Sequence, residues 1–364
     1  MGKRTLVGGL ALALVGWLMV GPSPAKAGGN PVVFEWVTVG APGNAPDTEV
    51  MAADRTTGYG AVAYQYDIGQ YLITNDQYVA FLNAVAKKGD PYLLWHPCLQ
   101  LPCYVTSGTG SGIVRSGLPG AWSYSVKPGM DRYPVNYVNL WDSLRFANWV
   151  NNGQGGPATT EYGAYTLLGG TAVPANALSV HRNPGAHVAL ASEDEWYKAA
   201  YYDGAKDVYY DWPTGTDTPT TCALPGPTPN TANCGLVTGA ANPANPGLPG
   251  VAGWGYSHVT PVGAYSGSAS PWGAYDMGGD LFQWTDTLSY AVVGQYHAGA
   301  NVAALQDALY GVTGNPFKDG LGPVGVLRGT DFGDGAEFMS ANGRTNDFTF
   351  SKWETYGIRL VRLG

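Results

Sequence analysis

Residues 273–284 read GAYDMGGDLFQW, a glycine-rich turn that carries large aromatic side chains near both ends. Such side chains supply the area that a core buries, and a disordered segment does not carry them. The whole chain has this character, with 12 Trp, 24 Tyr and 9 Phe beside 53 Gly and 26 Pro. We therefore expect a folded protein in which loops outweigh regular structure.

The charge composition excludes several classes of protein. Charged residues make up 13% of the chain, about half of the usual share, so a long helical bundle or coiled coil is excluded. The net charge is −8 and no run of Lys or Arg is present. A nucleic-acid partner is therefore not expected, because proteins that bind DNA or RNA need basic residues that neutralise the phosphates.

Three short helices are predicted from their start signals. Thr74 with Gln77 forms the capping box of the first helix, which has an apolar face and continues to Lys88. Asn139 caps the second helix, which ends at Gly153, and Ser192 with Glu195 caps the third. Alternating or apolar runs predict strands at 33–39, 61–68, 188–190 and 356–361. Long Gly, Pro and Asn loops separate these elements, and no linker divides the chain.

Several other segments accompany 273–284 in a fixed order along the chain. They are YLITNDQY at 71–78, YPVNYV at 133–138 with WD at 141–142 and ANW at 147–149, LASEDEW at 190–196, TPVG at 260–263, RGT at 328–330 and YGIR at 356–359. A single segment of this kind would be a weak signal, whereas an ordered set is specific.

This set resembles the motifs of the sulfatase-modifying-factor family, typified by the formylglycine-generating enzyme. The resemblance spans roughly residues 34–361. It implies an α+β fold, a large loop-rich relative of the C-type lectin fold, in a single domain over 28–364. A fold alone does not establish an activity.

The family's named activity is copper-dependent oxidation of a substrate cysteine to formylglycine by two active-site thiols. Soft sulfur ligands suit Cu(I). In this chain the corresponding stretch, 328–359, contains no cysteine, and the matching positions fall near Asp334 and Met339. One thioether does not replace two thiolates, so copper is not expected. None of the five histidines has the spacing of a helix or strand metal site either.

The resemblance also implies a structural calcium site. Its ligands transfer to the Asp276 side chain, the carbonyls of Gly279 and Leu281, and the Gln283 side chain. Oxygen ligands suit calcium, but Gln283 stands where the family has Glu, so binding is weakened unless Asp280 turns inward. The alternative is a metal-free loop that Asp276 ties to backbone N–H groups.

Residues 1–27 have the pattern of a signal peptide. Lys3 and Arg4 precede an apolar run from Leu6 to Val20, and Ala25-Lys26-Ala27 is a cleavage site of the small-x-small type. A membrane anchor is the alternative, but the run is short for a bilayer. We expect a secreted or periplasmic protein with no membrane association after cleavage.

An exported chain places its four cysteines in an oxidising compartment. Three pairings are possible, and we favour the local one, Cys98–Cys103 and Cys222–Cys234. Zinc is the weaker interpretation, because neither spacing is C-x2-C.

Two hypotheses about function follow. The first is a catalytically divergent binding or structural module that takes a protein or glycan ligand through its loop face. The second is a metal-dependent oxidoreductase of the same superfamily with a non-cysteine site. A broad exposed patch of the aromatic residues Phe332, Phe338, Phe348, Phe350 and Trp353 would favour a protein or glycan surface.

Overall fold

The strands form two separate four-stranded sheets rather than one continuous sheet. The computed structural model describes residues 31–100, 112–235, 259–289 and 324–364. One sheet has the order β1-β2-β14-β5 and the other has the order β12-β11-β10-β13. The strands are β1 Trp36–Val39, β2 Tyr66–Gly69, β5 Val188–Leu190, β10 Phe282–Ser289, β11 Val324–Arg328, β12 Thr345–Phe348, β13 Tyr356–Gly357 and β14 Leu360–Leu363.

The chain crosses from the second sheet to the first within two residues. β13 pairs in parallel with β10, and β14 then pairs antiparallel with both β2 and β5. In the part of the chain that the structure describes, three two-stranded ribbons accompany these sheets. They are β3 Ile113–Leu118 with β4 Ala121–Val126, β6 Tyr202–Asp203 with β7 Val208–Tyr209, and β8 Thr221–Cys222 with β9 Thr231–Ala232.

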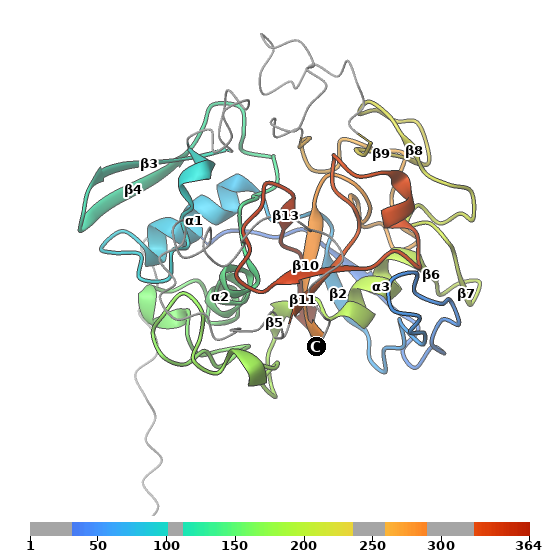
Figure 1. Cartoon of the computed structure of the whole chain (residues 1–364), viewed down its shortest axis with the longest axis horizontal. Helices are drawn as coiled ribbons and strands as arrows, with labels where there is room; N and C mark the ends of the chain where they lie inside the picture. Colours follow the sequence, from blue (N-terminus) through green and yellow to red (C-terminus); the bar gives the residue numbers. More distant parts are fainter. Residues whose placement is uncertain (1–30, 101–111, 236–258, 290–323) are drawn as a thin grey trace, which may run out of the picture.

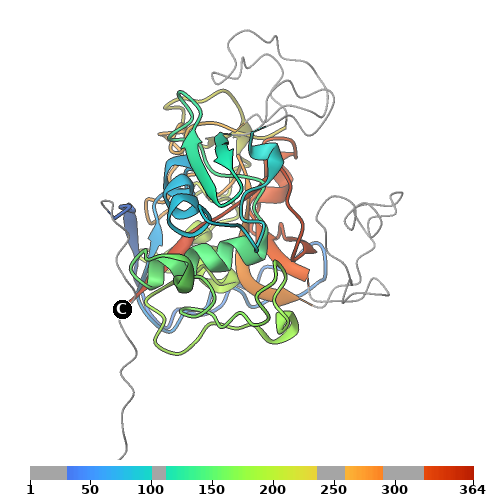
Figure 2. The same cartoon turned by 90° about the vertical axis from the view of Figure 1, so that its left-hand side faces the viewer.

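The helices begin where the sequence predicts. They are α1 Asn75–Val85, α2 Leu140–Asn151 and α3 Glu193–Tyr201, and each has a complete capping box, on Thr74, Asn139 and Ser192. α1 ends three residues before the predicted Lys88. Figures 1 and 2 show α1, α2 and the β3–β4 ribbon on one side of β10 and β11, with α3 and the β6 to β9 ribbons on the other.

Tryptophans fill the space between these layers. Trp141, Trp149, Trp196 and Trp284 are all fully buried. Trp284 donates from Nε1 to the Val138 carbonyl at 3.0 Å, which ties β10 to the start of α2. Aromatic area of this kind dominates core energetics. The α+β, loop-rich single domain expected from the sequence is confirmed.

Arg182 connects three of these elements. Its guanidinium forms two hydrogen bonds of 2.8 Å with the buried Glu195 carboxylate of α3. It also donates to Asp286 of β10 at 2.9 Å and to the Leu190 carbonyl of β5 at 2.7 Å. Loss of one partner from such a network leaves the remaining charge buried and unpaired.

Arg182→Ala should therefore lower the free energy of unfolding by about 3–5 kcal/mol. Arg362→Ala is the matched control, because Arg362 pairs with Asp67 while half exposed and should cost at most about 1 kcal/mol. Urea denaturation of both variants measures the difference. Equal losses would contradict the role given to Arg182.

Candidate functional site

The loop after β11 holds Asp334 and Met339, the residues singled out from the sequence in the 328–359 stretch. Met339 ends a 3-10 turn, Ala336–Met339, and is fully buried against Ala232 and Cys234. A Cβ added at Gly278 would lie 3.0 Å from the Met339 sulfur, so the thioether is closely packed. Met339 is a core residue.

Asp331 organises the same loop. Its Oδ1 accepts hydrogen bonds from the backbone N–H groups of Gly333 at 2.6 Å and Asp334 at 2.8 Å. The side chain is only 7% exposed. Burial, followed by the nearby Asp334 carboxylate, raises the pKa of Asp331 to about 7. The carboxyl group is therefore partly protonated near neutral pH.

Further carboxylates extend this site. Glu354 accepts a hydrogen bond from the Tyr137 hydroxyl at 2.9 Å, and burial raises the pKa of Glu354. Charge interactions link Asp331 to Asp334 and Glu354, and Asp334 to Glu337. We call these four residues, Asp331, Asp334, Glu337 and Glu354, the acidic loop face.

Tyr137 contacts Glu354 of this face and is not among the site residues predicted from the sequence. Its ring stacks on His96 with centroids 5.6 Å apart and planes inclined by 12°. Burial lowers the pKa of His96 to about 3, so the imidazole is neutral. Tyr137 also has φ = +53°, a rare value for a bulky residue. Its place in the YPVNYV segment is the only sequence signal that marks it.

The aromatic residues named as a candidate patch are not exposed. Phe332 and Phe350 are buried. Phe338, Phe348 and Trp353 are half-buried and pack against the main core. The surface that this loop presents is therefore set by carboxylates.

In the loop from Asp276 to Gln283, two of the expected calcium ligands, the Gln283 side chain and the Gly279 carbonyl, accept hydrogen bonds from other groups of the chain. Gln283 Oε1 accepts from Trp196 Nε1 at 2.8 Å and from Arg359 Nε at 2.7 Å. An amide oxygen has two lone pairs, so both are used. The Gly279 carbonyl accepts from the Leu281 N–H at 2.9 Å.

Asp280 does turn inward and is 2% exposed. Its Oδ1 accepts from the Thr260 N–H and from Asn233 Nδ2, both at 2.8 Å, whereas Oδ2 has no hydrogen-bond partner. Asp276 is also buried, and its Oδ2 accepts from the Gly263 N–H at 2.7 Å. The Asp276 carboxylate therefore does bond to a backbone N–H group, as in the metal-free alternative, but that group belongs to the TPVG segment and not to the loop of Asp276 itself.

Both carboxylates line a cavity of about 10 Å³, the size of one water molecule or small ion. Burial, followed by the Asp276 charge, raises the pKa of Asp280 to about 8, and burial also raises the pKa of Asp276. Two buried carboxylates beside a cavity of this size are chemically suited to a hard cation. Of the predicted calcium ligands, Asp276 and Gly279 line this cavity, as does Asp280.

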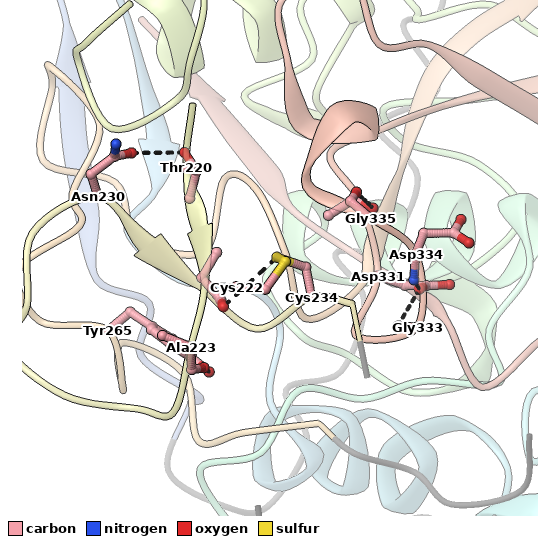
Figure 3. The surroundings of a disulfide bond; sticks show 12 residues. Thr220, Cys222, Ala223, Asn230, Cys234, Tyr265, Asp331, Gly333, Asp334 and Gly335 are labelled. Atoms are coloured by element: carbon pink, nitrogen blue, oxygen red, sulfur yellow. Dashed lines mark hydrogen bonds between the residues drawn. A yellow bond between two sulfur atoms is a disulfide. The ribbon is translucent and has the colours of Figure 1, made fainter. Parts of the chain in front are cut away.

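No group of three or more His, Cys, Asp or Glu side chains suited to a metal occurs within the described ranges. Cys222 and Cys234 form a disulfide, the local pairing favoured from the sequence, with Cα atoms 4.9 Å apart. Figure 3 shows it beside the loop of Asp331 and Asp334. Cys98 is also disulfide-bonded, but its expected partner Cys103 lies outside the described residues, as does the predicted signal peptide.

None of the helices described is both long and apolar enough to cross a membrane.

Comparison with known proteins gives one family. The family described as "Sulfatase-modifying factor enzyme 1-like domain" matches residues 42–363. Similar solved structures include "Crystal Structure of CarF", with 18% identity, 91% of this chain and 98% of that chain covered, and a TM-score of 0.47. Treponema denticola variable protein 1 has 17% identity, covers 94% and 99%, and has a TM-score of 0.44. PvdO from Pseudomonas aeruginosa has 17% identity, covers 90% and 91%, and has a TM-score of 0.40. A search of curated proteins found no match.

The raised pKa of Asp331 predicts a pH dependence of stability. A carboxyl group with a higher pKa in the folded state binds more protons there than when unfolded, so stability falls as pH rises from about 4 through 7. Asp331→Asn keeps the acceptor oxygen and removes this titration. Between pH 5 and 8 the wild type should lose about 1–4 kcal/mol more than the variant.

Urea denaturation at both pH values measures this difference. Asp76→Asn, at an exposed position of α1, is the control and should follow the wild type. Parallel profiles for the wild type and Asp331→Asn would contradict the raised pKa.

Proposed function

Because the chain belongs to the sulfatase-modifying factor enzyme 1-like family, we propose that it is an exported, catalytically divergent member that binds a partner through its acidic loop face. The observation that carries this proposal is what occupies the family's thiol positions. Met339 is packed in the core, and Asp334 belongs to a row of carboxylates. The loop therefore offers charge and hydrogen-bond acceptors in place of sulfur.

The charge of this face selects the class of partner. Asp334, Glu337 and Glu354 bring carboxylates together beside the buried Asp331, and the charges of Asp334 and Glu354 act to raise the pKa of Asp331. The chain as a whole has a net charge of −8. Complementary charge steers association and selects partners. We propose a protein partner with a Lys- or Arg-rich segment.

An oligo-lysine peptide is the probe for this proposal, and a neutral oligosaccharide is the alternative. Calorimetric titration should detect the peptide, with affinity falling as salt rises. Asp334→Asn should weaken binding about fivefold, equivalent to about 1 kcal/mol for one exposed charge pair. Asp76→Asn, which makes the same charge change on α1, should leave affinity unchanged.

Three outcomes contradict the proposal. Binding of the oligosaccharide alone would indicate a glycan ligand instead. Equal weakening by Asp334→Asn and Asp76→Asn would indicate nonspecific attraction. Conversion of a cysteine peptide to its aldehyde, with copper supplied and detected by mass spectrometry, would show that catalysis survives without the thiol pair.

We propose separately that calcium binds between Asp276 and Asp280. The support is twofold: Asp280 Oδ2 is buried with no hydrogen-bond partner, and Asp276 and Asp280, both buried, line the same small cavity. When bound, the ion would neutralise two carboxylates that otherwise repel each other. Asp280 would supply the charge that Gln283 lacks, while Gln283 stays bonded to Trp196 and Arg359.

Millimolar calcium should raise the melting temperature by about 3–8 °C. Asp280→Asn keeps the acceptor for Thr260 and Asn233 but removes the charge, so the calcium increment should be lost. Differential scanning calorimetry after thorough chelation measures the increment, with Asp76→Asn as the charge-matched control. The same increment in wild type and Asp280→Asn would contradict this site.

A further inference from the structure

Residues 231–235, here called the bridge segment, lie between the two sites described above. On one side, Asn233 Nδ2 donates to Asp280 Oδ1 at 2.8 Å, and the Asp280 N–H donates to the Asn233 carbonyl at 2.9 Å. The backbones also approach closely, since a Cβ added at Gly279 would lie 2.8 Å from the Asn233 carbonyl oxygen. The bridge segment thus forms one wall of the Asp280 environment.

On the other side, the bridge segment contacts the acidic loop face. The Gly235 N–H donates to the Asp334 carbonyl at 2.7 Å, and the Phe332 N–H donates to the Asp280 carbonyl at 3.1 Å. Figure 3 shows Asp331 and Asp334 on the Cys234 side of the disulfide. The two sites are therefore joined directly by the Phe332–Asp280 hydrogen bond and also through the bridge segment.

Little regular structure holds the bridge segment in place. Its strand β9 has two residues and pairs with the two residues of β8, and an isolated pair of this length is at best marginally stable. Thr231 N–H also donates to Ser268 Oγ at 2.9 Å. The covalent link is the Cys222–Cys234 disulfide, which closes a loop with a sequence separation of 12.

We propose that this disulfide is a redox-controlled latch. When it is intact, the bridge segment orders Asp280 and the acidic loop face together; when it is reduced, the segment detaches and both sites lose affinity. The link to affinity rests on the proposed function, whereas the loss of order does not. A disulfide acts mainly by restricting the states available to the open chain, so reduction makes those states accessible.

The chemistry requires a dithiol reductant. A thiolate of the reductant attacks Cys222 sulfur, because Cys222 is half-buried whereas Cys234 is fully buried. The S–S bond breaks, a mixed disulfide forms with Cys222, and Cys234 leaves as a thiolate that takes up a proton. The second thiol of the reductant then releases Cys222 as a thiol. The protein gains two electrons and two protons, and the reductant becomes a disulfide.

Amide hydrogen exchange tests the latch without reference to any ligand. In the double variant Cys222→Ser, Cys234→Ser, the amides of Gly235, Asp280 and Phe332 should exchange at least about tenfold faster, because opening is no longer restricted. Amides in α2 should be unchanged. Cys98→Ser, which removes a different disulfide, is the control and should leave the three amides protected.

Calcium titration of the same proteins separates the two proposals. The wild type treated with dithiothreitol and the double variant should bind calcium about tenfold more weakly than the oxidised wild type, since only an ordered fraction is competent. If the three amides exchange faster in the double variant but the oxidised wild type binds no calcium, the proposed calcium site is contradicted and the latch is supported. Unchanged exchange at the three amides, or equal acceleration in α2, would overturn the latch.

Discussion

The buried guanidinium of Arg359 is the interaction on which the arrangement of the two sheets depends. Arg359 lies between β13 and β14, where the chain passes from one sheet to the other, and is fully buried. It donates at 2.7 Å to the Gly69 carbonyl at the end of β2 and to the Tyr275 carbonyl. It also donates to Gln283 in β10. One side chain thus fixes both sheets and the loop before β10.

This arrangement explains what Gln283 does. A carboxylate at this position would neutralise Arg359, whereas the amide accepts from Arg359 and Trp196 and donates to the Asp276 carbonyl at 2.7 Å. Burial lowers the pKa of Arg359 to about 10, with the Asp276 charge acting in the opposite direction. The guanidinium therefore remains charged at neutral pH, and Asp276 is its nearby counter-charge. Gln283 therefore belongs to the scaffold, with all three of these hydrogen bonds made inside the protein.

Local signals made the helices predictable, because a capping box is a contact over three residues that the sequence displays directly. The Cys222–Cys234 disulfide is also local. The Asp280 environment was not predictable in the same way, since its partner Asn233 is 47 residues away along the chain. The sequence was equally uninformative about which residues of the candidate aromatic patch would be buried. Phe350 belongs to the core cluster only because the segment that carries it folds back over α2, where the Asn139 side chain donates to its carbonyl at 3.3 Å.

The motifs that identify the family are, in this chain, the ones that build the scaffold. Arg328 of the RGT segment forms a buried ion pair of 2.8 Å with Glu193 of the LASEDEW segment. Asp142 of the WD segment pairs with Lys352 at 2.6 Å while it caps α2. Removal of one partner from a buried ion pair strongly destabilises the folded protein. The fold therefore requires these residues whether or not the protein is a catalyst. Asp334 has a different place, because its half-buried side chain lies on a loop and its carboxylate takes no part in these buried pairs, whereas Met339 is packed in the core. The family's fold can therefore be retained for reasons of stability alone.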